Sequence, residues 1–225
     1  MIDSEPILLS WSGGKDCALA LAALAQDPAV HVAALLTSVT DGYDRISMHG
    51  VRRALLHRQA DSLGLPLFEA VIPQTCTNER YDAVMRESLE RARTAFPGLR
   101  RVAFGDLFLE DVRTYREARL ALAEMEALFP LWRRDTRTLA DEFVAHGFRA
   151  RLVCVDTTQL DGSFAGRSFD RVLLADLPPD VDPCGERGEF HTFVSDGPNF
   201  RQPVKYTLGE TVLREERFAY CDLLP

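Results

Sequence analysis

A short apolar run, two adjacent glycines and an alanine-rich segment constrain the fold of this chain most. Residues 7–9 are Ile-Leu-Leu, residues 10–16 are Ser-Trp-Ser-Gly-Gly-Lys-Asp, and residues 17–25 are almost wholly apolar. We expect a strand over 7–9, a tight turn, and a helix over 16–25. The start of such a helix offers unpaired N–H groups and the positive end of its dipole. The sequence therefore predicts a nucleotide-phosphate site near its beginning.

The amino-acid sequence of this turn distinguishes it from two common nucleotide-binding loops. A Walker loop needs G-x-x-x-x-G-K-[ST] and a Rossmann turn needs G-x-G-x-x-G, and the turn matches neither pattern. A turn that merely joins strand to helix is the alternative, which the agreement of position, spelling and periodicity disfavours. The predicted ATP-binding residues of the turn are Ser10, Ser12, Gly13, Gly14, Lys15 and Asp16.

The following residues alternate between strand and helix patterns. Strands are expected over 30–37, 67–72 and 101–104, and helices over 50–63, 77–95 and 111–129. Alternating elements with short connections predict an α/β fold with a doubly wound parallel sheet.

A Pro-Leu-Trp segment at 130–132 marks the expected domain boundary, which gives domains of residues 1–132 and 133–225. The second, smaller domain is predicted to be α+β. Its expected helix covers 135–146, and its expected strands cover 149–155, 190–194, 204–206 and 210–220. Residues 169–177 fit a strand or a helix.

Composition excludes several classes of protein. The 225 residues carry a net charge of −8, which disfavours nucleic acid as a partner. The 5 cysteines form no C-x-x-C pair, so neither a disulfide framework nor a zinc site is expected. No apolar run approaches the roughly 18–20 residues of a membrane helix and no signal peptide is recognised, so we expect a cytoplasmic protein. Only Lys15 and Lys205 are lysines, an arginine bias typical of GC-rich bacterial genomes.

The second concentrated motif is Pro-Cys-Gly-Glu-Arg-Gly-Glu-Phe-His-Thr-Phe at 183–193. Paired acids near a nucleotide can hold Mg²⁺, orient ammonia or act as a general base. Glu189 and His191 would share one face of a strand. Because glycines flank them, we expect Glu186 and Glu189 to act in the chemical step rather than in folding or ATP binding. A polar surface hairpin is the alternative. Cys184 is either a nucleophile or an incidental thiol.

Two further polar sites follow strands of the predicted sheet. His49 follows the second strand and Gly105-Asp106 follows the fourth. Doubly wound sheets bind ligands beyond the carboxyl ends of their strands. His49 is therefore a candidate for catalysis or phosphate binding, against a polar residue at a helix entry. Asp106 is a candidate for binding Mg²⁺ or substrate, against a helix cap.

These motifs occur in one order: the glycine turn, Met48-His49, Gly105-Asp106, residues 130–132 and residues 185–192. With them the chain resembles the diphthine–ammonia ligase family along nearly its whole length. Its glycine turn resembles the PP-loop of ATP pyrophosphatases, which holds the β,γ-pyrophosphate while chemistry occurs at the α-phosphorus. The resemblance implies a HUP-type first domain, also called adenine nucleotide α-hydrolase-like, and backbone contacts of Thr37 to adenine. Eukaryotic and archaeal ligases of this kind convert the diphthine of elongation factor 2 into diphthamide with ATP and ammonium.

The leading hypothesis is therefore an ATP-dependent amide ligase that uses Mg²⁺. A substrate carboxylate, on a small molecule or a protein, is adenylated with release of pyrophosphate, and ammonia then displaces AMP. The alternatives are a tRNA-modifying PP-loop enzyme and a non-catalytic ATP-binding regulatory protein. A homodimer is left open. The candidate catalytic residues are Lys15, His49, Glu186, Glu189 and His191.

Overall fold

A computed structural model describes residues 4–42, 45–46 and 50–225. Its larger sheet has six strands within these residues. Four of them form the parallel centre, in which β1 lies between β2 and β5, and β6 pairs with β5. β4 continues the parallel order on the far side of β2, and β3 adds a short antiparallel pairing at the end of β2. The strands are β1 (Glu5–Ser10), β2 (Val30–Thr40), β3 (Arg45–Ile46), β4 (Leu67–Ile72), β5 (Arg101–Ala103) and β6 (Glu126–Leu128).

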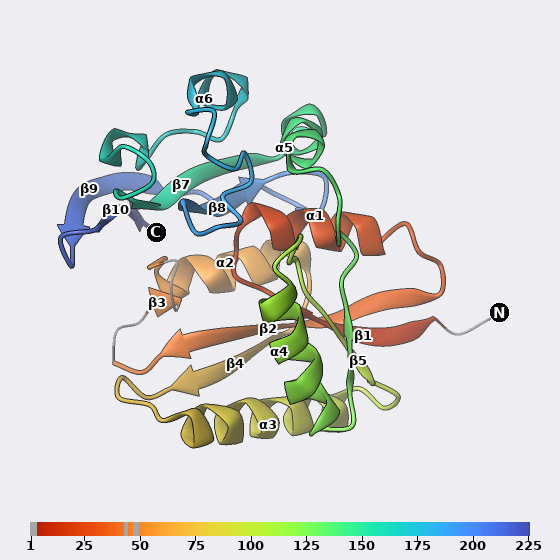
Figure 1. Ribbon diagram of the computed structural model, residues 1–225. Helices are drawn as coiled ribbons and strands as arrows, with labels where there is room; N and C mark the ends of the chain where they lie inside the picture. The colour runs from red at the N-terminus through yellow and green to blue at the C-terminus, as the bar shows by residue number, and fades with distance from the viewer. Residues whose placement is uncertain (1–3, 43–44, 47–49) are drawn as a thin grey trace.

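Helices cover both faces of this sheet (Figure 1). One face carries α1 (Lys15–Leu24) and α2 (Arg53–Leu63), and the other carries α3 (Asn78–Ala95) and α4 (Glu110–Ala121). The parallel order is β4-β2-β1-β5-β6, so the chain changes direction across the sheet between β1 and β5. Ligands of doubly wound sheets bind at such a switch point, beyond the carboxyl ends of the strands.

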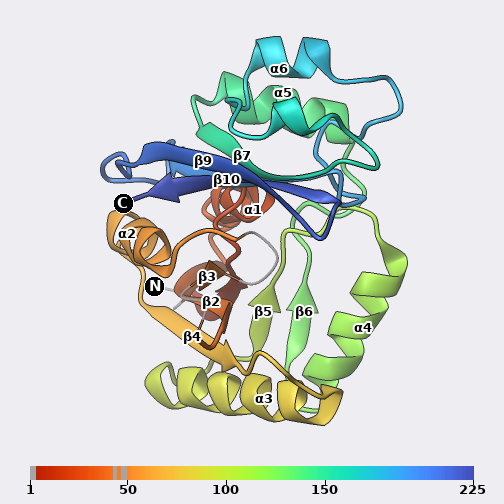
Figure 2. The same ribbon diagram turned by 90° about the vertical axis from the view of Figure 1, so that its left-hand side faces the viewer.

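The second sheet is antiparallel and has the order β8-β7-β10-β9. Its strands are β7 (Arg149–Asp156), β8 (Phe190–Asp196), β9 (Thr207–Arg214) and β10 (Phe218–Leu224). It lies over α1 and α2, while α5 (Thr136–Ala145) and α6 (Arg171–Asp176) cover its other side (Figure 1, Figure 2). A short 3₁₀ helix, Gly162–Phe164, follows β7.

The two sheets share one hydrophobic core. A single cluster of buried side chains extends from Leu9 of β1 through Leu19 of α1 to Phe193 of β8. A helix that is apolar on nearly all sides is typical of a buried position, and the alanine-rich α1 accordingly lies between the two sheets. Hydrogen bonds join the layers as well. Asn199 Nδ2 donates to the carbonyl of Ala18 at 2.7 Å, and the Arg201 N–H donates to the carbonyl of Ser62 at 2.9 Å.

The predicted α/β class and the smaller second sheet are confirmed. The helix expected over 111–129 is wrong, because α4 ends at Ala121 and residues 126–128 form β6. The strand expected over 210–220 is also wrong, since it is two strands of a hairpin. Left-handed residues other than glycine make both turns, namely Glu124 (φ 55°), Glu215 (φ 51°) and Glu216 (φ 52°).

Smaller differences concern the ends of elements. β2 continues to Thr40 rather than ending at 37, and α2 begins at Arg53 rather than at 50. Residues 204–206 form no strand, and the ambiguous segment 169–177 contains the helix α6. The domain boundary at 130–132 stays a prediction. Among the described residues, no helix combines the length and the apolar character needed to cross a membrane.

Candidate functional site

The glycine turn after β1 is fixed from behind by the second sheet. The carbonyl of Gly13 accepts hydrogen bonds from the Val194 N–H at 2.8 Å and from Gln59 Nε2 at 3.0 Å. Gly13 has a φ of 80°, and a Cβ there would lie 2.7 Å from Oε1 of Gln59. Glycine is therefore required at this position for both its conformation and its space. These contacts direct the carbonyl of Gly13 toward α2 and β8.

Lys15 begins α1 and is bound through both its backbone and its side chain. Its N–H donates to Oγ1 of Thr192 at 3.0 Å, and its Nζ lies 2.8 Å from each carboxylate oxygen of Asp16. Burial lowers the pKa of Lys15, but Asp16, together with Cys184 and Glu186, outweighs burial and holds that pKa above the usual lysine value. The ammonium group is therefore charged although the residue is only 2% exposed.

A cavity of about 250 Å³ lies in front of the turn. The start of α1, the carboxyl end of β5, α4 and the segment 185–192 all contribute to its walls. Most of the predicted site residues meet there, although they come from distant parts of the sequence. Its lining residues are Ser10, Ser12, Gly14, Lys15, Asp16, Cys17, Phe104, Gly105, Asp106, Arg116, Gly185, Glu186, Gly188, Phe190, His191 and Thr192.

Gly105 and Asp106 form the β5 side of the cavity. A Cβ on Gly105 would lie 2.8 Å from the backbone carbon of Asp16, so only glycine lets β5 approach α1 this closely. Asp106 is paired with Arg116 of α4, whose Nε lies 2.7 Å from Oδ2 of the aspartate. The Arg116 guanidinium also lies over the ring of Phe104, at 4.3 Å from its centroid.

Arg116 was missed by sequence reasoning. It lies in the middle of α4, within a helix rich in charged residues, and no local pattern distinguishes it from its neighbours. Its pairing with Asp106 is a tertiary contact. The two atoms Asp106 Oδ2 and Arg116 Nε are buried and, among the described residues, have no well-oriented hydrogen-bond partner.

Glu186 connects the C-terminal segment to the end of β5. Its Oε1 accepts a hydrogen bond from the N–H of Leu107 at 2.7 Å. Burial raises the pKa of Glu186 to about 7, and the charges of Asp16 and Asp106 add to this, while the Leu107 N–H opposes it. A carboxyl group that titrates near neutral pH suits a general base. Glu186 therefore has the position and the acidity that a proton acceptor in this cavity needs.

Glu189 has a different environment. Its side chain is only 2% exposed and does not line the cavity. One oxygen accepts from the N–H of Asp182 and the other from the N–H of Arg187, each at 2.9 Å. Both carboxylate oxygens are therefore used inside the turn that Glu189 closes. A role for Glu189 in the chemical step stays a prediction.

His191 and Thr192 are adjacent on β8 and both line the cavity. Burial lowers the pKa of His191 to about 4, and the nearby charge of Lys15 acts in the same direction. His191 is therefore neutral at physiological pH and offers one N–H donor and one nitrogen acceptor. Glu189 precedes β8, so the two residues do not share a strand face as expected.

Two other candidates lie away from the cavity wall. Thr37 is buried within β2, where its hydroxyl donates to the carbonyl of Trp11 at 2.5 Å. The thiol of Cys184 donates to the carbonyl of Thr136 at 3.2 Å, and burial raises the pKa of this thiol to about 12. Cys184 is therefore protonated and not a nucleophile at neutral pH. His49 lies outside the described residues.

No group of three or more His, Cys, Asp or Glu side chains among the described residues is placed to hold a metal ion by itself. Asp16, Asp106 and Glu186 nevertheless line one cavity. Mg²⁺ is commonly held by one or two carboxylates together with phosphate oxygens of a substrate. The acidic side chains therefore fit a magnesium ion that arrives with a nucleotide.

The fold and this cavity define a HUP-like α/β protein with a ligand cavity at the sheet's switch point. The family model for the diphthamide synthase N-terminal domain matches residues 6–119, and that for the C-terminal domain matches residues 135–222. The chain belongs to the diphthamide synthase family, which confirms the resemblance drawn from its motifs.

Two curated relatives are both named diphthine–ammonia ligase. The chain is 27% identical to one from Schizosaccharomyces pombe over 217 residues, which is 89% of this chain and 36% of that protein. It is 27% identical to one from Danio rerio over 229 residues, which is 91% of this chain and 88% of that protein. The chain thus spans about a third of the yeast protein and most of the fish protein.

Proposed function

We propose that this protein is an ATP-dependent ligase that adenylates a substrate carboxylate and forms an amide with ammonia. The observation that carries the proposal is the single cavity in which the glycine turn meets Glu186. One side of this cavity offers a lysine and a helix start, which suit a polyphosphate. The other side offers a carboxyl group that titrates near pH 7, which suits a proton acceptor.

The reaction has two steps. In the first, a carboxylate oxygen of the acceptor attacks the α-phosphorus of ATP, and pyrophosphate leaves as the acyl-adenylate forms. In the second, the ammonia nitrogen attacks the acyl carbon, and AMP leaves with the electrons of the broken C–O bond. Glu186 takes the proton that the nitrogen loses. Donors fixed around the turn stabilise the charge that develops on the pyrophosphate.

The remaining residues bind and orient the substrates. Lys15, Ser10, Ser12 and Gly14 contact the phosphates, and the neutral His191 donates a hydrogen bond to them. Asp16 and Asp106 would hold a Mg²⁺ ion that arrives with the nucleotide, and the metal would supply charge neutralisation for the phosphates. Glu189 keeps the 182–190 turn in the shape that presents Glu186. The backbone around Thr37 receives adenine, and His49 assists at the phosphates.

The names of the two relatives suggest diphthine as the model acceptor, with ammonia as the nitrogen donor. For this chain we propose the chemical class alone, a carboxylate that is converted into an amide in the cytoplasm. Neither tRNA modification nor nucleotide sensing is favoured by a feature of this cavity.

Product analysis tests the proposed function directly. The protein is incubated with ATP, Mg²⁺, ammonium chloride and a panel of carboxylates, and the nucleotides are separated by chromatography. We expect AMP and pyrophosphate in equal amounts, with release that depends on one of the carboxylates. ADP with orthophosphate would place the attack at the γ-phosphorus, and ATP that stays intact with every carboxylate would indicate a nucleotide sensor.

A further inference from the structure

The hairpin of β9 and β10 carries much of the apolar surface that this protein exposes. Eight large apolar side chains are exposed among the described residues, and four of them belong to this hairpin. They are Leu208, Val212 and Leu213 of β9 and Leu224 of β10, and Leu213 is 61% exposed. Single exposed apolar residues are ordinary, but a group of them on one element marks an interaction surface.

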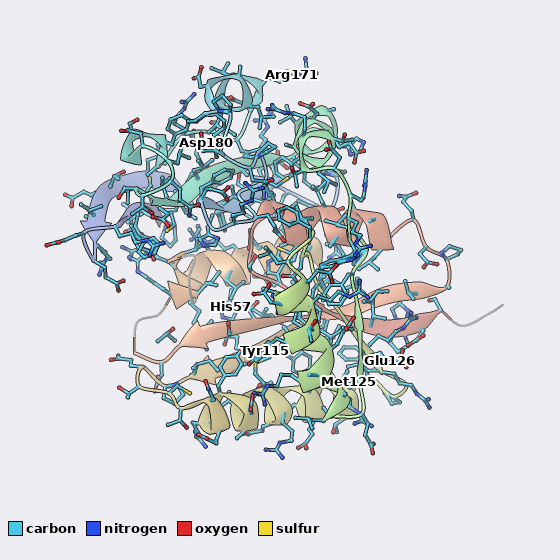
Figure 3. The ribbon with its side chains drawn as sticks, in the orientation of Figure 1. His57, Tyr115, Met125, Glu126, Arg171 and Asp180 are labelled. Carbon is cyan, nitrogen blue, oxygen red and sulfur yellow. The ribbon has the colours of Figure 1, made fainter. Side chains whose placement is uncertain are left out.

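The outer edge of β9 is open. β9 pairs with β10 on one side, and no described strand lies on its other side. The opposite edge of the same sheet is covered, because the Val194 N–H of β8 donates to the carbonyl of Gly13. Figure 3 shows the side chains of the hairpin extending outward at the margin of the molecule. An open edge offers its unpaired N–H and C=O groups to another strand.

The charges of β9 are complementary to those of a second β9. Glu210 and Arg214 are exposed, and within the described part of the chain neither takes part in a salt bridge. Four residues along a strand span roughly 13 Å, so these two side chains share a face but do not meet on one strand. In an antiparallel pair centred on Val212, each Glu210 lies opposite Arg214 of the partner subunit. Residues opposite each other in this way have Cβ atoms about 4.5–5.5 Å apart.

The backbone of β9 suits this pairing. Residues 211–214 pair with β10 in regular register, and the irregularity of the ladder lies before Thr211. The same centre places Thr211 opposite Leu213 of the partner subunit and makes the two Leu213 side chains diagonal neighbours on the other face. Such diagonal pairs lie within reach of long side chains. Charge and apolar contacts therefore agree on one register.

We infer that a second copy of this chain binds the outer edge of β9 in an antiparallel, two-fold arrangement centred on Val212. The two four-stranded sheets then continue into one sheet of eight strands. A two-fold axis uses the same surface on both copies, so a self-complementary strand is what such an interface requires. The cavity at the glycine turn adjoins β8, at the other edge of the sheet, and stays accessible. The inference goes beyond the proposed function and does not depend on it.

The test is a charge exchange followed by sedimentation velocity and by light scattering after gel filtration. Glu210→Arg and Arg214→Glu each place like charges opposite one another twice in the dimer, and the double variant restores opposite charges. Glu126→Arg is the matched control, because Glu126 is an exposed glutamate on β6, the edge strand of the larger sheet. Figure 3 labels Glu126 on the side of the molecule away from the hairpin. Circular dichroism checks the folding of each variant.

We expect a weak dimer with a dissociation constant on the order of 10 µM, because the interface is small. Each single reversal should weaken association about tenfold or more, and the double variant and Glu126→Arg should dimerise like the wild type. If a reversal does not fold, Leu213→Lys replaces it and should weaken association as well. A wild type that is monomeric at about 300 µM would overturn the inference. So would single reversals that dimerise like the wild type, or a folded double variant that stays monomeric.

Discussion

Two turns meet at the cavity, and their charged side chains have different kinds of partner. The turn before α1 has one buried lysine, whose partner is the next residue in the chain, Asp16. The turn at 182–190 has three acids, and two of them, Asp182 and Glu189, accept hydrogen bonds from backbone N–H groups of that same turn. Glu186 instead accepts a hydrogen bond from the N–H of Leu107, which follows β5.

The difference shows that residue type alone does not assign a role. Glu186 and Glu189 are three residues apart and both are flanked by glycine, so they are equivalent as a pattern. In the fold, Glu189 has both oxygens occupied by the backbone, whereas Glu186 faces the cavity with a pKa raised to about 7, chiefly by burial. A pair of matched glutamine variants can therefore separate chemistry from architecture.

The largest effect is expected for Glu186→Gln, which removes the proton acceptor but keeps an oxygen for the Leu107 N–H. Turnover, measured as ammonium-dependent pyrophosphate release, should fall by about 10²–10⁴-fold. ATP affinity should stay close to that of the wild type, and the melting temperature near neutral pH should not fall, because the glutamine removes a buried carboxylate whose ionisation destabilises the fold. If this variant retains full turnover, Glu186 is not the base and the proposed cavity chemistry is wrong.

The pH dependence of turnover gives a second measure of Glu186. A base works when deprotonated, so turnover should rise with pH through about 7 and then level off. The pKa of Glu186 in the folded state lies above the usual 4.5. Between pH 4.5 and about 7 the folded state therefore binds more protons than the unfolded state. The free energy of unfolding should accordingly fall as the pH rises from about 4.5 to about 7. Denaturant titrations should show that Glu186→Gln loses this fall. A turnover profile that is flat from pH 5 to 8 would contradict the assignment.

The next effect is expected for Lys15→Ala in the glycine turn. Loss of a charge-assisted contact to the phosphates corresponds to about 1.5–3 kcal/mol, or roughly a 10- to 150-fold weaker ATP affinity by calorimetry. Lys205→Ala is the natural control, because Lys205 is the only other lysine of the chain and is exposed. Unchanged affinity in a folded Lys15→Ala protein would exclude the turn as the phosphate site.

The smallest effect on turnover and the clearest effect on stability are expected for Glu189→Gln. The amide oxygen of the glutamine can accept a hydrogen bond from one of the two backbone N–H groups. Its NH₂ group faces the other N–H, which then has no acceptor. An unsatisfied buried donor costs about 1–3 kcal/mol of the free energy of unfolding, which urea titration resolves. Equal stability of Glu189→Gln and the wild type would show that these hydrogen bonds do not hold the turn.

The sequence predicted the parts of this molecule that depend on local chemistry. Adjacent glycines between an apolar run and an alanine-rich segment indicated the strand, turn and helix at residues 7–25, and β1 and α1 are found there. Failures occurred where residues other than glycine take a left-handed conformation. Glu124 ends α4 and Glu215 and Glu216 turn the β9–β10 hairpin, although none of them is a residue that usually signals a turn.

Sequence reasoning also missed side chains that reach the site only through the tertiary structure. Gln59 of α2 fixes the glycine turn by hydrogen bonds to Gly13 and Trp11, yet it lies in the middle of an ordinary helix. Arg116 pairs with Asp106 and was missed for the same reason. Such residues have no spacing rule relative to the motif they serve, because the distance along the chain between partners is set by the topology of the sheet.

The position of α1 between two sheets has a consequence for how the chain can be divided. A fragment that stops at Trp132 would keep the larger sheet but would expose to water the faces of α1 and α2 that the second sheet covers. The uncovered apolar surface would drive such a fragment to self-associate. The same contacts offer a basis for reassembly in trans, because residues 133–225 added as a separate chain would supply Thr192 and Val194 to the waiting glycine turn.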